Sequence, residues 1–228
     1  MQRYQRVLQQ RNGLLKRIQA REASRSELSF WDQELAHAGG VIMKGRAHAL
    51  SILVPRASEQ MIRLSEQVET LEMSYRPALG QHAENDLPLD ETEWTARMLQ
   101  ALEEGRDREV GAGVTLVGPH RDDLAVLVAG FPAGSFASRA QLRTAALSLR
   151  LAEANYLQVS LGDEPVVLLD DVLSELDERR RKGVVEHFES FQQSIVTTAD
   201  PDRVREVLTR ATGRYVVAGG GITRFEGE

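Results

Sequence analysis

Residues 164–183 read EPVVLLDDVLSELDERRRKG, and they determine how the rest of the chain is interpreted. Four apolar residues, starting at Val166, run directly into two carboxylates, Asp170 and Asp171. A short apolar run without polar interruption is typical of a strand in a parallel sheet that is covered on both faces. We therefore expect a central strand over 165–169 with the two carboxylates at its carboxyl end.

The carboxylate pair has two interpretations. One is a turn that starts a helix over 174–191, because Ser174 and Asp177 have the S-x-x-D spacing of a helix start. The other is a site for a metal ion and a phosphate, because ligands of open α/β sheets bind at the carboxyl ends of the strands. There a first carboxylate can hold Mg²⁺ and a second can polarise an attacking water. On these residues alone, both interpretations stay open.

The sequence after residue 136 alternates helices and strands. Helical apolar spacing and short apolar runs predict helix 136–161, strand 165–169, helix 174–191, strand 194–197, helix 201–211 and strand 214–218. Such alternation is typical of a parallel sheet with helices packed on it. The three glycines at 219–221 predict a flexible turn and no phosphate loop, because they lack the strand–glycine–helix context.

The first half of the chain is mainly helical. Apolar spacing predicts an amphipathic helix over 1–25 with a basic opposite face, and a second helix over 27–68 that Gly39-Gly40 and Pro55 could interrupt or bend. Further patterns predict strand 69–79, loop 80–90, helix 91–105, and strands 114–117 and 124–128. We expect a helical lobe from the two long helices.

The composition argues against several classes of protein. The net charge is −6 and aromatic residues make up 5% of the 228 residues, so the chain is not globally basic and offers no platform of stacked aromatics for single-stranded nucleic acid. The absence of cysteine excludes disulfides and thiolate metal sites. No apolar run approaches the length that spans a bilayer, and the first residues lack the apolar core of a signal peptide. We therefore expect a soluble, cytoplasmic protein without membrane contact.

Four segments resemble one family of ATPases. PVVLLDDVLSELDERRR, at 165–181, resembles the Walker B segment and D-loop of ABC-type ATPases, most closely those of the RecF family. FASRAQLRTAALSLRLAEA, at 136–154, resembles the signature segment of that family, and TLVGPHRDDL, at 115–124, resembles another of its characteristic stretches. The opening helices, with QRVLQQRNGLLK and FWDQELAHAGG, look like the helical lobe of the family. The order and spacing also match, so the resemblance covers nearly the whole chain.

The resemblance implies a fold and a function. The fold would be α/β, with the C-terminal part of an ABC-ATPase head at 111–228 and a helical lobe with a short strand region at 1–110. The family implies an ATP-dependent, Mg²⁺-requiring DNA-binding protein of recombination repair. Such a protein works at single-strand gaps and single-strand/double-strand junctions, dimerises around two ATP molecules, acts with RecR- and RecO-like partners, and helps to load the recombinase.

The resemblance also assigns roles to individual residues. Asp170 would hold Mg²⁺, and Asp171 would orient the attacking water as the catalytic base. Asp177 would be the D-loop acid at the dimer seam, and Thr198 or Asp200 would lie near the switch position. The signature, which meets the γ-phosphate bound by the other subunit, would consist of Ser138, Arg139, Ala140 and Gln141.

Two features depart from the family pattern. The phosphate loop G-x-x-x-x-G-K-[ST] does not occur in this chain, because its three lysines, Lys16, Lys44 and Lys182, are each followed by Arg or Gly. We therefore expect a fragment, a truncated gene product or one half of a split protein that does not hydrolyse ATP by itself. In the signature, Ala140 stands where the family usually has Gly, and Leu142 replaces a usual polar residue. The methyl group of Ala140 would hinder a close approach of the backbone to phosphate.

Other interpretations compete with the ATPase site. His120, Arg121, Asp122 and Asp123 form a polar cluster that is either a metal site or an ordinary hairpin turn with salt bridges. The basic residues of helix 1–25 either contact DNA phosphates or form a solvated face. The chain as a whole could be a non-catalytic module that binds DNA or a partner, or part of an SMC-type head, although it shows no long heptad run.

Overall fold

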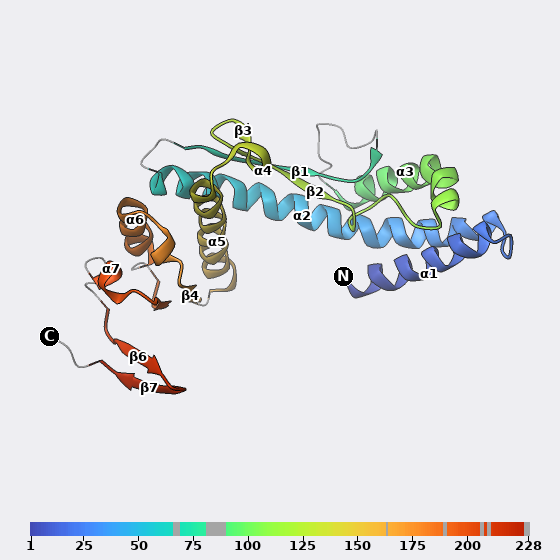
Figure 1. The fold of residues 1–228 in the computed structure, drawn as a ribbon. Coiled ribbons are helices and arrows are strands. Elements are labelled where there is room, and N and C mark those ends of the chain that lie inside the picture. The colour runs from blue at the N-terminus through green and yellow to red at the C-terminus, as the bar shows by residue number, and fades with distance from the viewer. Residues whose placement is uncertain are drawn as a thin grey trace. The chain divides into compact units, whose positions relative to one another are not determined.

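The computed structural model describes residues 1–65, 69–80, 90–162, 164–188, 191–205, 208 and 211–225 (Figure 1). The chain forms two compact units. Unit 1 consists of Met1–Ser58 and Thr70–Ala137, and unit 2 consists of Glu59–Glu69 and Ser138–Glu228. The division into a lobe at 1–110 and a head at 111–228 stays a prediction. Among the described residues, no helix has both the length and the apolar character that crossing a membrane requires.

Three helices build most of unit 1, with α1 and α3 lying along the first part of α2 (Figure 1). They are α1 (Gln2–Gln19), α2 (Leu28–Leu64), which follows the 3-10 turn η1 (Arg25–Glu27), and α3 (Glu91–Ala112). Their apolar faces meet in a core that includes Tyr4, Val7, Leu35, Met43, Trp94, Met98 and Leu102. The predicted amphipathic helix at 1–25 is therefore present, although it ends at Gln19.

The helix α2 runs without interruption through Gly39-Gly40 and Pro55, although these residues predicted a break or bend. The two glycines have a packing role against α3. A Cβ atom at Gly39 would lie 2.9 Å from Cε of Met98, and one at Gly40 would lie 3.0 Å from the backbone nitrogen of Thr95. The glycine pair therefore permits a close approach of two helices and does not end the helix.

A three-stranded antiparallel sheet completes unit 1. It consists of β1 (Leu71–Arg76), β2 (Asp123–Val128) and β3 (Phe131–Pro132), and the short helix α4 (Ala133–Phe136) follows it. The predicted strands 69–79 and 124–128 are confirmed. The predicted strand 114–117 is wrong, because this segment runs as irregular backbone. Its Thr115 bonds to Asn12 and Arg11 of α1 and not to a neighbouring strand.

Unit 2 contains the alternating helices and strands that the sequence predicts. They are α5 (Arg139–Leu161), β4 (Val166–Asp170), the 3-10 turn η3 (Leu173–Glu175), α6 (Glu178–Phe188), β5 (Gln193–Thr197) and α7 (Pro201–Arg205). The strands β4 and β5 pair in parallel, with Asp170 opposite Thr197. The predicted parallel sheet is therefore present, with two strands among the described residues.

One face of the β4–β5 sheet is covered and the other is open. Leu169 of β4 packs in a core with residues of α5, η3 and α6, including Leu147, Leu151, Leu173, Val184 and Phe188. On the opposite face, the exposed fractions are 53% for Val166, 69% for Leu168 and 47% for Ile195. The predicted cover of this strand on both faces is not found among the described residues, whose core lies on one side of the sheet only.

The described residues end in an antiparallel hairpin of β6 (Tyr215–Ala218) and β7 (Gly221–Arg224). Gly219 and Gly220 form its turn with φ values of 57° and 78°, a backbone region that glycine adopts readily. The predicted strand 214–218 and the glycine turn are confirmed. The expectation that this strand continues the parallel sheet is wrong, because β6 pairs with β7.

Candidate functional site

Asp170 ends the strand β4, and a threonine of the neighbouring strand holds its carboxylate. The hydroxyl of Thr197 donates a hydrogen bond to Oδ1 of Asp170 at 2.6 Å. Both side chains are exposed. Because successive side chains of a strand point to opposite faces, Asp170 lies on the same face as Leu168, and Thr197 lies on the same face as Ile195. The carboxyl end of the open sheet face therefore carries an accessible, oriented carboxylate.

Asp171 adopts an unusual backbone conformation. Its φ value is 52°, in the left-handed region that L-residues other than Asn and Asp rarely enter. Its N–H donates to the carbonyl oxygen of Thr197 at 3.2 Å and to the hydroxyl of Thr197 at 3.1 Å. Such conformations cost roughly 1–3 kcal/mol and cluster at functional sites. The left-handed turn places a second exposed carboxylate directly after the first.

The segment after the pair is a short turn and not the predicted helix start. Ser174 donates its hydroxyl proton to the carbonyl oxygen of Asp171 at 2.8 Å. The cap of α6 is Asp177, whose Oδ1 accepts from the backbone N–H of Arg180 at 2.9 Å. The predicted start box of Ser174 and Asp177 is wrong, because Asp177 itself caps a helix that begins at Glu178.

Two arginines of α6 hold this turn, and sequence reasoning missed both. Arg181 is buried and donates to the carbonyl oxygen of Leu173 at 3.1 Å and of Leu176 at 2.9 Å. Arg180 pairs with Asp177 at 2.9 Å and with Glu69 at 3.1 Å. In the sequence, an arginine run at a helix start is typical of a solvated face. The contacts of Arg181 with the turn carbonyls and of Arg180 with two carboxylates appear only in the structure.

The predicted signature residues form the N-terminus of α5 in the same unit as the carboxylates. Ser138 is the N-cap: its Oγ accepts from the N–H of Gln141 at 3.2 Å, and Oε1 of Gln141 accepts from the N–H of Ser138 at 2.7 Å. Arg139 is exposed and Ala140 is half-buried. The described contacts of Ser138 and Gln141 thus stay within the cap and do not reach Asp170. A helix N-terminus of this kind presents backbone N–H groups that favour an anion.

The candidates for the switch position, Thr198 and Asp200, contact each other, and their role stays a prediction. Thr198 closes a turn of its own, because its Oγ1 accepts from the N–H of Asp200 at 3.1 Å and donates to the Asp200 carbonyl oxygen at 3.2 Å. The residue that contacts Asp170 is its neighbour Thr197. The parallel pairing of β4 and β5 sets Asp170 opposite Thr197, a register that no local pattern in the sequence indicates.

Asp170 and Asp171 suit a magnesium ion. Mg²⁺ takes oxygen ligands and is typically bound through one or two protein carboxylates, with water and phosphate oxygens completing its shell. Two adjacent exposed carboxylates on an accessible edge meet that requirement. In the described ranges, no group of three or more His, Cys, Asp or Glu side chains is arranged to hold a metal ion, so a site made of protein ligands alone is not found there.

The polar cluster at 120–123 is engaged inside unit 1. Asp122 accepts hydrogen bonds from the hydroxyl of Tyr75, from Nη1 of Arg46 at 2.8 Å and from the N–H of Ala78 at 2.8 Å. Burial, followed by the hydrogen bond to Asp122, raises the pKa of Tyr75 well above its usual value, so that the phenol remains a donor. These contacts support the salt-bridged turn, one of the two interpretations that the sequence left open.

His120 belongs to the same cluster. Its Nδ1 lies 2.8 Å from the hydroxyl of Tyr4, and its Nε2 lies 3.2 Å from the carbonyl oxygen of Thr115. Partial burial lowers the pKa of the imidazole below its usual 6.5. Both ring nitrogens are used in hydrogen bonds within unit 1, so the ring joins α1 to the irregular segment before β2.

Arg11 does not belong to the basic face of α1. Its side chain is fully buried and pairs with Asp32 at 2.8 Å and with Glu109 at 2.7 Å. For Arg11, neither alternative for the basic residues of this helix holds, a DNA contact or a solvated face, because the side chain is buried. The exposed cations of α1 and the residues after it include Arg6, Lys16, Arg17 and Arg21.

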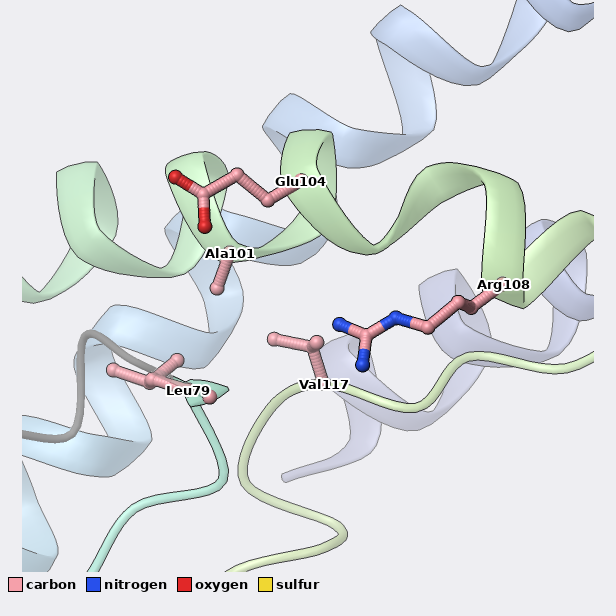
Figure 2. Close-up of a pocket in the computed structure, with 6 residues that line it drawn as sticks. Leu79, Ala101, Glu104, Arg108 and Val117 are labelled. Carbon is pink, nitrogen blue, oxygen red and sulfur yellow. The ribbon is translucent and has the colours of Figure 1, made fainter.

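Unit 1 also contains a shallow pocket, shown in Figure 2. Leu79, Ala101 and Val117 give it apolar walls, and the guanidinium of Arg108 extends toward Val117. Its volume of about 230 Å³ is below the range of roughly 300–1,000 Å³ that is usual for ligand sites. The carboxylate pair belongs to unit 2, so this pocket is not part of the candidate site.

Several known proteins are similar to this chain over most of its length. No protein-family model matches the sequence. The DNA replication and repair protein RecF of Roseiflexus castenholzii is 42% identical over 224 residues, covering 95% of this chain and 56% of that protein. The RecF protein of Herpetosiphon aurantiacus is 41% identical over 205 residues, covering 89% of this chain and 50% of that protein.

A solved structure agrees with the sequence comparisons. The structure of the recombination mediator protein RecF with ATP, in the RecFOR pathway, superposes with a TM-score of 0.81 and 30% identity. It covers 98% of this chain and 57% of that one. The match confirms the predicted α/β fold class of an ABC-ATPase-like head with a helical lobe. The chain therefore belongs to the RecF family of DNA replication and repair proteins, and it spans a little over half the length of the relatives that it matches.

Proposed function

We propose that this chain supplies the metal-binding and water-orienting carboxylates, together with the signature helix, of a RecF-like ATP-dependent DNA-repair protein. The observation that carries the proposal is the geometry at the end of β4. Asp170 is oriented by Thr197, and Asp171 is held in a left-handed turn, so that two carboxylates stand exposed at the carboxyl edge of a parallel sheet. A helix cap alone would not need the strained second residue, because Asp177 supplies the cap of α6.

Each residue would have one role in this site. Asp170 would hold Mg²⁺, which when bound neutralises charge on the phosphates of ATP. Asp171 would accept a hydrogen bond from the attacking water and take its proton as the water adds to the γ-phosphate. Asp177 would stand at the dimer seam, while Ser138, Arg139, Ala140 and Gln141 would present the N-terminus of α5 to the γ-phosphate of a second subunit.

The remaining part of the site would come from outside these residues. The open face of the β4–β5 sheet carries the exposed apolar side chains of Val166, Leu168 and Ile195 next to Asp170. The matched relatives are nearly twice as long as this chain. Both facts support a further segment that covers the open face and carries the phosphate loop. Two heads would then close over two ATP molecules, closure would clamp DNA at single-strand gaps, and RecR- and RecO-like partners would act with the dimer in loading the recombinase.

A chimera tests this function. The phosphate-loop segment of the Roseiflexus castenholzii relative would be fused ahead of residue 1. We expect Mg²⁺-dependent ATP turnover by the chimera and none by the chain alone. Asp171→Asn should lower kcat by about 10²–10⁴-fold, the usual contribution of a general base. Glu72→Gln, which changes an exposed carboxylate of β1 in unit 1, is the control and should leave turnover unchanged.

Two results would contradict the proposal. Full turnover by the Asp171→Asn chimera would show that Asp171 does not orient the attacking water. Steady turnover by the highly purified chain alone, abolished by Asp171→Asn, would show that the site needs no further segment. The first result tests the role of Asp171, and the second tests the need for a further segment, so each can be contradicted separately.

The alternative is a non-catalytic DNA- or partner-binding module. The exposed cations Arg6, Arg17 and Arg21 in and after α1 favour it. Binding of DNA that weakens with salt, is unaffected by ATP and is reduced by Arg6→Glu with Arg17→Glu would support this module. ATP-dependent DNA binding by the chimera would instead favour the ATPase function.

A further inference from the structure

We propose that Thr197 is the positioning residue of the carboxylate pair: its hydroxyl sets the orientation in which Asp170 receives a divalent cation. The inference rests on the proposed function, because it concerns the same site. It goes beyond that function because it assigns a role to Thr197 of β5. This residue would not bind the metal ion itself, and the proposed function gives it no role.

The hydroxyl of Thr197 contacts both members of the pair. It donates to Oδ1 of Asp170 at 2.6 Å and accepts from the N–H of Asp171 at 3.1 Å. A hydroxyl has one proton to donate and two lone pairs to accept with, so it makes both bonds at once. One oxygen atom therefore links the side chain of the first carboxylate to the backbone of the second.

The strand pairing makes this contact specific. Parallel registration of β4 and β5 sets Asp170 opposite Thr197 at the last paired position. The branched side chain of threonine has few allowed χ1 rotamers, so its hydroxyl is held in place before any ligand arrives. Serine would keep the hydroxyl, and valine would keep the branched shape without it.

The hydrogen bond leaves one oxygen of Asp170 for a ligand. With Oδ1 taken by Thr197, Oδ2 is the oxygen available to a hard cation such as Mg²⁺ or Mn²⁺. Without the hydroxyl, an exposed aspartate samples several rotamers and the cation must restrict them on binding. The left-handed turn at Asp171 keeps a second acceptor, the Thr197 carbonyl oxygen at 3.2 Å, so loss of the hydroxyl should not undo the turn.

The next residue offers a matched control. Thr198 has the same side chain and lies one position later, but its hydroxyl bonds to the backbone of Asp200. A change at Thr198 therefore removes a hydroxyl from the same loop without touching Asp170. Any effect that is specific to Thr197 can then be assigned to its contact with the carboxylate.

Mn²⁺ titration of the isotope-labelled chain, followed by NMR, tests the inference. Mn²⁺ broadens the amide signals of residues near its binding site, here Asp171 and Thr197, and this signal does not depend on catalysis. We expect Thr197→Val to weaken the apparent Mn²⁺ affinity about tenfold, as changes to residues that orient metal ligands commonly do. Thr197→Ser should restore the affinity, and Thr198→Val should leave it unchanged.

The outcomes separate this inference from the proposed function. Selective broadening that Asp170→Asn abolishes, with Thr197→Val equal to the wild-type chain, would overturn the role of Thr197 and leave the metal site standing. Broadening that persists in Asp170→Asn would overturn the metal site itself. If the spectrum of Thr197→Val showed an unfolded unit 2, Thr197→Ala would replace it in the same comparison.

Discussion

In unit 1 the buried carboxylates of Asp32 and Glu109 each face the guanidinium of Arg11, whereas in unit 2 the carboxylates of Asp170 and Asp171 stand next to each other in solvent. Among the described residues, neither member of the exposed pair forms an ion pair. The first arrangement satisfies every charge that it buries. The second leaves two carboxylates together, and a neutral hydroxyl, that of Thr197, bonds to the side chain of Asp170 and to the backbone of Asp171.

This difference distinguishes the structural use of charge in unit 1 from the metal-binding use that we propose for the pair in unit 2. A buried ion network is consistent with a role in fixing how α1, α2 and α3 pack, since each missing partner leaves a charge in a medium of low polarity. An exposed, unpaired carboxylate pair contributes little to folding, and its strained backbone even opposes it. We therefore expect mutations in the buried network to lower the free energy of unfolding. Mutations in the carboxylate pair should instead change ligand binding and have little effect on stability.

Removal of Arg11 should give the largest effect on stability. Arg11→Met leaves Glu109 buried without its arginine and Asp32 with only Arg106, so we expect a loss of about 3–5 kcal/mol in the free energy of unfolding. Urea denaturation measures this loss. The matched control is Arg3→Met, which breaks the exposed pair of Arg3 with Glu34 and should cost less than about 1 kcal/mol. Equal losses for the two variants would contradict the structural role of the buried charge network in unit 1.

Glycine and alanine variants of the carboxylate pair should differ in stability by a smaller amount, and the sign of the difference should be reversed between the two positions. At Asp171, whose φ is 52°, we expect the Gly variant to be more stable than the Ala variant by about 1 kcal/mol, because glycine enters the left-handed region without steric cost. At Asp170, in regular strand conformation, we expect the Gly variant to be less stable than the Ala variant by about 0.5–1 kcal/mol. Thermal unfolding of the four variants measures both differences. The same sign at both positions would contradict the strained turn.

The sequence predicts the site's elements well, because they depend on local signals. The apolar run of β4 and the helical spacing of apolar residues after residue 136 are each visible in a short stretch, and the alternation in unit 2 follows from such stretches in sequence. The glycine turn at 219–221 is equally local. In contrast, the contact of Thr197 with Asp170 depends on a register between strands 27 residues apart, which no local pattern encodes.

Long-range packing also explains why some sequence-based predictions were wrong. Gly39-Gly40 predicts a helix break from its own propensity, but the approach of α3 determines its role. Arg11 falls among six other basic residues in the first 25, and only the partners Asp32 and Glu109, 21 and 98 positions away, show that it is buried. The open face of β4 could not be predicted, because an apolar run is the same whether or not this chain supplies the residues that cover it.

The smallest expected effect is a pH dependence from His120. Its pKa is lowered in the folded state by partial burial, while the unfolded chain has the usual value near 6.5. Below pH 6.5 the unfolded state therefore binds more protons than the folded state, and the free energy of unfolding rises with pH. The stabilisation from neutral His120 is fully present above pH 6.5 and is lost as the pH falls through the lowered pKa.

Urea denaturation of the wild-type chain and of His120→Gln between pH 5 and 7.5 isolates this contribution. Because part of the ring is exposed, we expect only a shallow difference, which grows as the pH rises toward neutrality. The carboxylate pair gives the comparison: Asp170→Asn should leave the contribution of His120 to this pH profile unchanged, since Asp170 lies in unit 2 and His120 lies in unit 1. A steeper pH profile for His120→Gln than for the wild-type chain would mean that the ring is stabilised in its charged form, contrary to the contacts with Tyr4 and Thr115.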